Sequence, residues 1–163
     1  MARIFAITGA AGHLGGTLTR LLMERNARVR ALVLPGDKLA LRLPPQVEQV
    51  EGDVTRPETL APLFAHEAGD ELIVLHCAGI VTIASKYDEK VHAVNVDGTR
   101  NIIAACQKYG AARLIYVSSV HALPVLPKGQ RMREITDFSP DRVEGLYAQT
   151  KAEATASVLE AAR

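Results

Sequence analysis

The stretch "RIFAITGAAGHLGG", residues 3–16, joins a short apolar run to glycines at every third position. Residues 3–8 are almost all apolar and end at a glycine, which predicts a buried strand. From Gly12 onward the apolar residues recur with helical spacing, which predicts an amphipathic helix. These apolar residues are Leu14, Leu18, Leu21 and Leu22. The chain therefore begins with a strand, a glycine-rich turn and a helix.

The rest of the chain repeats this alternation. Further strands are expected at 28–34, 47–54, 71–79 and 113–119, and helices at 57–68, 86–109 and from about 145 to the end, with a short helix or loop at 38–43. The helix of about 86–109 is expected to carry five residues on one side: Val91, Val94, Gly98, Ile102 and Cys106. Alternating strands and helices indicate parallel strands with crossover helices, and continuously apolar strands indicate a sheet covered on both faces. We expect an α/β fold with a doubly wound parallel sheet of order 3-2-1-4-5.

Length and composition narrow the classes of protein. The 163 residues are enough for one domain, spanning 1–163. The net charge of +1 is too small to attract the negatively charged backbone of nucleic acid, so nucleic-acid binding is not expected. No apolar run is long enough to span a membrane and no signal peptide is recognisable, so a cytoplasmic protein is expected. Cys77 and Cys106 lie in apolar runs without CxxC spacing, which favours buried, reduced thiols over a disulfide or a metal site.

The first strand-to-helix turn can hold a pyrophosphate, because a helix start offers free N–H groups and a partial positive charge. Gly9 would permit the tight turn, Gly12 the close approach of a phosphate, and Gly15 the packing of helix against strand. The amides of His13 and Leu14 would then face the phosphates. A plain glycine-rich turn is the alternative, but the strand before and the helix after favour dinucleotide binding.

The second strand leaves the choice between NAD and NADP open. Its end, "LVLPGDK", has neither a carboxylate nor an arginine where the ribose would lie. Asp37 could reach a 2′-hydroxyl, Lys38 or Arg42 could reach a 2′-phosphate, or all three could be solvated loop charges.

Two further turns follow predicted strands. In "GDV", Asp53 could accept from an adenine amino group, or it could be a simple turn aspartate. In "HCAGI", small residues at the carboxyl end of the fourth strand would let a cofactor lie against the sheet, or they reflect tight packing.

The last predicted helix carries Tyr147 and Lys151 at i, i+4, on one face. A nearby ammonium favours the phenolate, so that Tyr147 could exchange a proton with an alcohol or ketone. A hydroxyl from Ser118 or Ser119 could hydrogen-bond the substrate oxygen, and strand alternation lets only one of the two serines point into such a site. Taken singly, these spacings are common by chance.

Taken in order, these motifs resemble the extended short-chain dehydrogenase/reductase family, and within it the dihydroflavonol-reductase and 3β-hydroxysteroid-dehydrogenase branch, often called NAD-dependent epimerase/dehydratase. The matching stretches are "TGAAGHLG", "GDVT", "HCAG", "NVDGTRNI", "YVSSVHAL" and "YAQTK". The resemblance implies a Rossmann fold and a catalytic triad of Ser119, Tyr147 and Lys151. It also implies contacts with NAD or NADP, in which Lys151 would hold the nicotinamide ribose. The cofactor contacts expected are Gly9, Gly12, His13, Leu14, Gly15, Asp53, Val54, Ala78, Gly79 and Lys151.

The resemblance further implies a small-molecule substrate and a homodimer built on the 86–109 and Tyr/Lys helices. Asn95 is expected to make a helix-packing hydrogen bond, and no histidine is expected to be catalytic. The family's C-terminal substrate lobe is expected to be absent from this sequence, which stops at Arg163. One edge of the sheet and the apolar face of the last helix would then be uncovered, and such surfaces favour self-association.

An NAD(P)-dependent oxidoreductase or epimerase acting on a secondary alcohol or ketone is thus the first hypothesis. The alternative is a non-catalytic dinucleotide-binding sensor or partner module.

Overall fold

The computed structural model describes all 163 residues, and they form two compact units. The first unit comprises Met1–Ala78 and Asn101–Val117, and it contains the whole sheet. The second unit comprises Gly79–Arg100 and Ser118–Arg163. Each unit is described by itself below.

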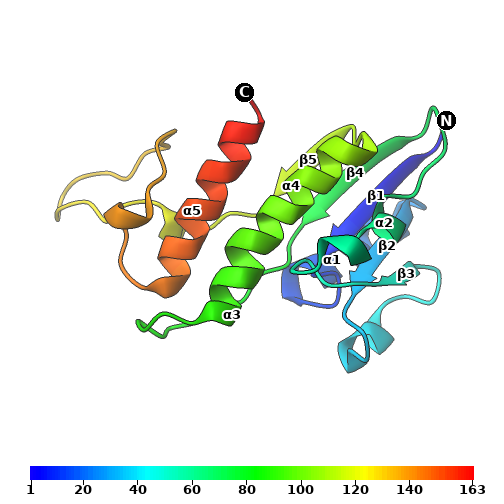
Figure 1. Ribbon diagram of the computed structural model, residues 1–163, viewed down its shortest axis with the longest axis horizontal. Coiled ribbons are helices and arrows are strands. Elements are labelled where there is room, and N and C mark those ends of the chain that lie inside the picture. The colour runs from blue at the N-terminus through cyan, green and yellow to red at the C-terminus, as the bar shows by residue number, and fades with distance from the viewer. The chain divides into compact units, whose positions relative to one another are not determined.

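The sheet of the first unit has five strands that all run parallel. They are β1 (Arg3–Thr8), β2 (Arg28–Val33), β3 (Glu48–Glu51), β4 (Glu71–His76) and β5 (Arg113–Tyr116). Their order, β3-β2-β1-β4-β5, confirms the expected doubly wound topology (Figure 1). The last three strands stop three residues earlier than expected. At β5 the reason is its pairing, because the β4–β5 ladder ends where His76 faces Tyr116.

Side chains on both faces of this sheet are buried, as the continuously apolar strands predict. On one face, Ile7, Ala31 and Leu75 belong to a core cluster that α1 (His13–Glu24) covers with Leu22 and Met23. On the other face, the alternate positions of the same strands are also buried. These are Ile4, Ala6, Leu32, Leu72 and Val74.

The expected helix over 57–68 is wrong in extent. A 3₁₀ turn, Pro57–Thr59, is followed by the single-turn α2, Ala61–Phe64. Pro62 explains the interruption, because its ring lacks an N–H and clashes with the carbonyl four residues earlier in any helix that runs through it. Another 3₁₀ helix, Lys38–Arg42, follows β2.

Arg30 of β2 is a charged side chain inside the first unit, with only 4% of its surface exposed. Its guanidinium donates to the carbonyls of Leu63 and Ala65 at the end of α2. Its Nε lies 2.9 Å from Glu48 Oε1 of β3, an ion pair without hydrogen-bond geometry. Arg30 therefore ties α2 and β3 to the centre of the sheet.

Helical backbone begins in the second unit with α3 (Glu89–His92) and a π-helical turn (Ala93–Asp97), and it continues as α4 (Gly98–Tyr109), whose residues from Asn101 onward belong to the first unit. Asp88 caps this run by accepting hydrogen bonds from the amides of Lys90 and Val91. The long helix expected at 86–109 is thus present. Val94 is half-buried, whereas the neighbouring Asn95 and Val96 are buried. The extra residue of the π turn changes which side chains face inward.

The second unit ends in α5 (Leu146–Ala161), close to the expected bounds. Short 3₁₀ turns, Val120–Ala122 and Pro140–Arg142, lie between β5 and α5. A small core joins this connection to the helix, and it consists of Ala122, Val143, Ala148 and Ala152 with Phe138 against them.

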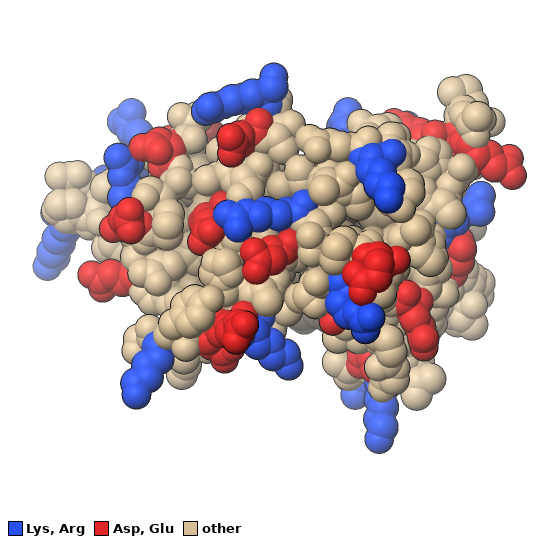
Figure 2. Space-filling model, in the orientation of Figure 1, with Lys and Arg blue, Asp and Glu red and all other residues tan.

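On the face that Figure 2 shows, positively and negatively charged side chains are interspersed, and neither sign gathers in a large patch. This distribution agrees with the net charge of +1. None of the helices combines the length and the apolar character that crossing a bilayer requires.

Candidate functional site

The glycine turn between β1 and α1 is held by its own backbone. Gly9 adopts φ +67°, a left-handed conformation that favours glycine, and its carbonyl accepts a hydrogen bond from the Gly12 amide at 3.0 Å. A Cβ on Gly9 would lie 2.7 Å from the Ala78 nitrogen after β4, closer than atoms pack. A Cβ on Gly15 would overlap the Gly9 carbonyl oxygen. Both positions therefore need glycine for the fold itself.

Gly12 differs from its two neighbours in the motif. A Cβ there would contact the protein only at the Gly9 oxygen, 3.2 Å away, and would otherwise meet open space. Its backbone, φ −77° and ψ −179°, is one that any residue adopts. The fold thus constrains Gly12 by one tight contact, far less than it constrains Gly9 or Gly15, and the open space beside Gly12 would admit a ligand.

The N-terminus of α1 lies open beside this turn. Gly12 is the N-cap, no side chain caps the helix, and its first turn holds no acidic residue. His13 and Leu14 are the first two residues of the helix, where amides have no partner within it. A cavity of about 320 Å³ adjoins the turn. The free amides, the absence of a Cβ and the partial positive charge fit a dinucleotide phosphate.

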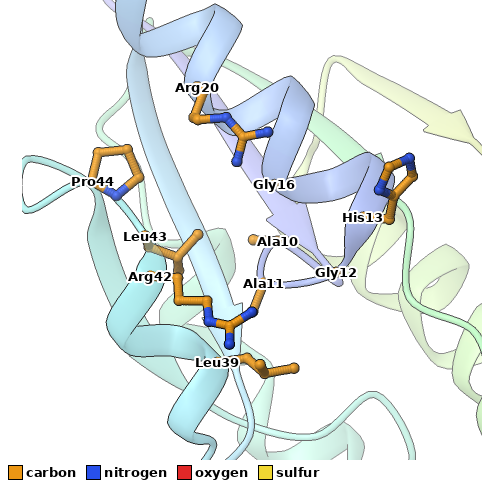
Figure 3. A pocket seen from close by; sticks show the side chains of 10 residues that line it. All are labelled: Ala10, Ala11, Gly12, His13, Gly16, Arg20, Leu39, Arg42, Leu43 and Pro44. Carbon is orange, nitrogen blue, oxygen red and sulfur yellow. The ribbon is translucent and has the colours of Figure 1, made fainter.

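Two arginines reach this cavity and no carboxylate lines it (Figure 3). Arg20 extends from α1, and the guanidinium of Arg42 lies beside Ala11. The lining residues are Ala10, Ala11, Gly12, His13, Gly16, Arg20, Leu39, Arg42, Leu43 and Pro44. Of the three charged residues that could choose between NAD and NADP, only Arg42 lines the cavity, whereas Asp37 and Lys38 do not.

Asp37 and Asp53 both have structural partners. Asp37 Oδ1 accepts from the Leu39 amide at 2.8 Å and caps the 3₁₀ helix. Asp53 Oδ1 accepts from the amide and the hydroxyl of Thr55, at 2.9 and 2.8 Å. These are the bonds of turn aspartates, and contact of Asp53 or Val54 with an adenine stays a prediction.

At the end of β4, side chains join it to β1. His76 is fully buried, and its Nδ1 lies 2.6 Å from the Thr8 hydroxyl. That hydroxyl also accepts from the Ala78 amide at 3.2 Å. The polar contact with Thr8 holds the chain that leads to Ala78 against the glycine turn. Sequence reasoning assigned Thr8 no role, although a polar residue ending an apolar strand was a visible signal.

The second unit contains a separate cavity of about 390 Å³, and it brings Ser119 and Tyr147 together. Its other lining residues are Val81–Ala84, His121, Glu144, Gly145, Leu146 and Ala148. Ser119 caps the turn after β5, where its Oγ accepts from the His121 amide at 3.2 Å. Ser118 instead places its Oγ 2.6 Å from Thr155 Oγ1 of α5. The arrangement favours Ser119 over Ser118 as the serine beside Tyr147.

Tyr147 lies in the first turn of α5, which begins at Leu146 after Gly145 in a φ +90° conformation. Lys151 follows one turn later, with 5% of its surface exposed. The helix therefore holds the pair at the expected spacing.

Two further residues line this cavity: His121, to which the sequence assigned no catalytic role, and Glu144, which the sequence did not single out. The His121 ring lies edge-on to the Tyr147 ring, with centroids 6.1 Å apart. The available signal was the position of His121 two residues after Ser119, because a short turn there returns the chain toward the cavity.

Asn95 makes the packing hydrogen bonds that the sequence predicts. Its Oδ1 accepts from the Ile80 amide at 2.7 Å, and its Nδ2 donates to the Ile80 carbonyl and to Thr150 Oγ1, each at 3.0 Å. Thr150 in turn donates to the carbonyl of Tyr147 at 2.9 Å. Asn95 thus links the segment at Ile80 to the first turn of α5.

A family model matches residues 5–163, nearly the whole chain, and its description is NAD dependent epimerase/dehydratase family. The chain belongs to this family. The resemblance drawn from the motifs is thereby confirmed.

Relatives within the epimerase/dehydratase family point to the expected branch. The chain is 34% identical to 3 beta-hydroxysteroid dehydrogenase type 7 of Mus musculus, over 97% of this chain and 44% of the relative. It is 32% identical to a putative dihydroflavonol 4-reductase of Synechocystis, over 100% of this chain and 46% of the relative. The crystal structure of gox2253 superposes with a TM-score of 0.83 at 33% identity, covering 99% of this chain and 47% of that one. The chain thus spans about half the length of the curated relatives it matches.

Proposed function

We propose that this chain is the cofactor-binding part of an NAD(P)-dependent oxidoreductase that transfers a hydride between the nicotinamide and a secondary alcohol or ketone. The observation that carries the proposal is the cavity lined by both Tyr147 and Ser119, with Lys151 one turn further along the same helix. Membership of the epimerase/dehydratase family supports it.

The glycine turn is proposed to hold the pyrophosphate. The amides of His13 and Leu14 would donate to its oxygens at the start of α1, and the missing side chain at Gly12 would let the phosphate reach them. Ala78 and Gly79, small residues after β4, are proposed as further contacts. When bound, the nicotinamide supplies or accepts the hydride.

Tyr147 acts as the acid and base in this proposal. A free phenol has a pKa of about 10, so it is a weak base at neutral pH unless its anion is stabilised. In this proposal Lys151, one helical turn further along α5, would hold its ammonium near the Tyr147 oxygen when substrate is bound. As a phenolate Tyr147 would take the hydroxyl proton of an alcohol, and as a phenol it would return the proton to a ketone oxygen in the reverse direction.

Ser119 is proposed to orient the substrate. Its Oγ accepts from the His121 amide, which leaves the hydroxyl proton available for the substrate oxygen. That hydrogen bond would stabilise the charge that develops on the oxygen. Val81 and Ile83, which line the same cavity and are exposed, would contact apolar parts of the substrate.

The test is Tyr147→Phe in the whole protein, with Tyr87→Phe as the control, since Tyr87 is exposed and does not line the cavity. Turnover of a panel of secondary alcohols with NAD⁺ or NADP⁺ should fall by roughly 10²–10⁴-fold in the first variant and stay unchanged in the second. Cofactor affinity, measured by calorimetry, should not change. Equal turnover in both variants would remove the role assigned to Tyr147, and cofactor binding without any turnover would favour the binding-module alternative.

A further inference from the structure

The cavity that brings Ser119 and Tyr147 together has one carboxylate on its wall, that of Glu144. No lysine, arginine or second acidic residue lines this cavity. Glu144 is exposed and takes part in none of the ion pairs of the structure. A carboxylate without a cationic partner makes the electrostatic potential inside such a cavity negative.

The basic residues near Glu144 in the chain do not neutralise it at the cavity wall. Arg142, two residues earlier, is paired with Asp137, with 2.9 Å between Nη1 and Oδ2. Lys151 lies further along α5 and does not line the cavity. His121 does line it, but histidine side chains are ordinarily uncharged at pH 8. A positive charge that balances Glu144 inside the cavity would therefore come from a ligand.

The backbone on both sides of Glu144 is anchored. Val143, just before it, is buried in the small core of the second unit. Gly145, just after it, is the N-cap of α5, and the first helical residue, Leu146, is buried as well. The carboxylate is thus attached to a fixed point of the cavity wall, three residues before Tyr147.

We propose that Glu144 makes this cavity selective for a secondary alcohol or ketone that also carries a positively charged group, such as a protonated or quaternary amine. This selectivity rests on the proposed function, whose substrate class it names. Val81 and Ile83, exposed apolar residues of the same cavity, would contact the carbon chain between the reacting carbon and the cation. A carboxylate or phosphate in the place of the cation would be repelled by Glu144.

A carboxylate just before a helix can also act on the helix alone, by favouring the positive end of its dipole. The N-cap of α5 makes no side-chain hydrogen bond, and the first turn of α5 holds no acidic residue, so Glu144 is the acidic residue closest to this end in the chain. Such a role would change the stability of the protein but not its choice between substrates. The experiment therefore measures both.

The experiment compares three secondary alcohols in the whole protein at pH 8, each with NAD⁺ and with NADP⁺. The alcohols share one carbon skeleton and end in a trimethylammonium group, in the neutral tert-butyl group of the same shape, or in a carboxylate, with two to five carbons as the spacer. At the best spacer length, kcat/KM of the cationic alcohol should exceed that of the neutral one by about 10-fold, because opposite charges about 4 Å apart in a partly solvated site attract by that much or more. The anionic alcohol should fall below the neutral one.

Three variants assign the preference. Glu144→Gln removes the charge and should bring the three values of kcat/KM within about 2-fold of one another. Glu144→Lys should reverse their order. Glu134→Gln is the matched control, because Glu134 is an exposed carboxylate of the same connection that does not line the cavity, and this variant should keep the wild-type order. Circular dichroism and thermal unfolding check the fold, and if Glu144→Lys does not fold, Glu144→Gln decides.

Each failure has its own signature. A wild-type protein that prefers the neutral or the anionic alcohol overturns the selectivity. A cationic preference that persists in Glu144→Gln assigns it to another group and also overturns the role of Glu144, as does a lower melting temperature with an unchanged order of substrates. If no alcohol is turned over, the proposed function fails. Calorimetry with the trimethylammonium and tert-butyl alcohols then tests the charge preference by itself, and equal affinities would overturn it.

Discussion

The three glycines of the turn can be separated by what a methyl group would meet at each position. At Gly15 a Cβ would overlap the Gly9 oxygen and lie 3.0 Å from Ala10 Cα, so α1 would have to move away from the turn. At Gly12 a Cβ would meet only the Gly9 oxygen, at 3.2 Å. We therefore predict that Gly15→Ala damages the fold, whereas Gly12→Ala damages cofactor binding alone.

The magnitudes follow from these contacts. Overpacking of a rigid site costs about 1–3 kcal/mol, and a clash with backbone atoms belongs at the upper end, so Gly15→Ala should lower the free energy of unfolding by about 3 kcal/mol. Gly12→Ala loses a favourable N-cap, about 0.5–1 kcal/mol, but gains a similar amount because alanine restricts the unfolded chain. Its net effect on stability should stay within about 1 kcal/mol.

Two measurements test this difference. Urea unfolding followed by circular dichroism gives the stability of each variant, and calorimetry with NADP⁺ and NAD⁺ gives the affinity. Gly12→Ala should fold almost as stably as the wild type and bind either cofactor at least 10-fold more weakly, because its methyl group would obstruct the approach of the phosphate. Normal affinity in Gly12→Ala would refute the phosphate role of this glycine. A loss of stability as large as that of Gly15→Ala would refute the packing argument.

Three further predictions concern the serines, the buried arginine and a thiol. Ser119→Ala should lower turnover by about 10-fold or more. Ser118→Ala removes a hydroxyl that contacts Thr155, so it should change the melting temperature more than the turnover. Steady-state kinetics and thermal unfolding measure both effects, and a larger loss of turnover in Ser118→Ala than in Ser119→Ala would contradict the assignment. Arg30→Met should lower the free energy of unfolding by about 2 kcal/mol, because the carbonyls of Leu63 and Ala65 at the end of α2 lose their donor. An unchanged urea midpoint would contradict this. Burial raises the pKa of the Cys106 thiol to about 12 from an ordinary 9.0, so the unfolded chain loses the proton first. Relative to Cys106→Ala, the wild type should therefore lose stability as the pH rises above 9, and a pH-independent difference in urea midpoints would exclude the effect.

The fold was predictable because its signals are local and mutually consistent. Each strand is a short apolar run, each connection long enough to cross the sheet, and glycines mark the turns, so the order β3-β2-β1-β4-β5 followed from general rules of handedness and connection. Strand ends and the short α2 were less predictable, because they depend on where a neighbouring strand stops pairing and on the ring of Pro62. The homodimer and the cytoplasmic location stay predictions.

The candidate site was predictable only in part. Spacing along α5 was enough to place Tyr147 and Lys151 on one helix face, because that relation lies within one element. The choice between Ser118 and Ser119 depends on a partner far away in sequence, Thr155, and the arrival of His121 at the cavity depends on a 3₁₀ turn. Neither relation can be derived from the spacing of residues along a strand.

The π turn at Ala93–Asp97 shows how a local irregularity can serve the site. A regular helix through this segment would be expected to bury Val94, but the structure instead buries Asn95. A buried amide is costly unless its hydrogen bonds are made, and here the oxygen and both N–H groups of Asn95 have partners. Those partners lie on Ile80 and Thr150, next to the two segments that line the cavity of Tyr147. The irregular turn thus turns a polar side chain inward, where it holds together the loop after Gly79 and the first turn of α5. An apolar residue at position 95 could fill the space but could not make these hydrogen bonds to the two segments. The polar residue within an otherwise apolar helix face therefore positions the cavity walls, a role that the 3.6-residue helical period alone does not reveal.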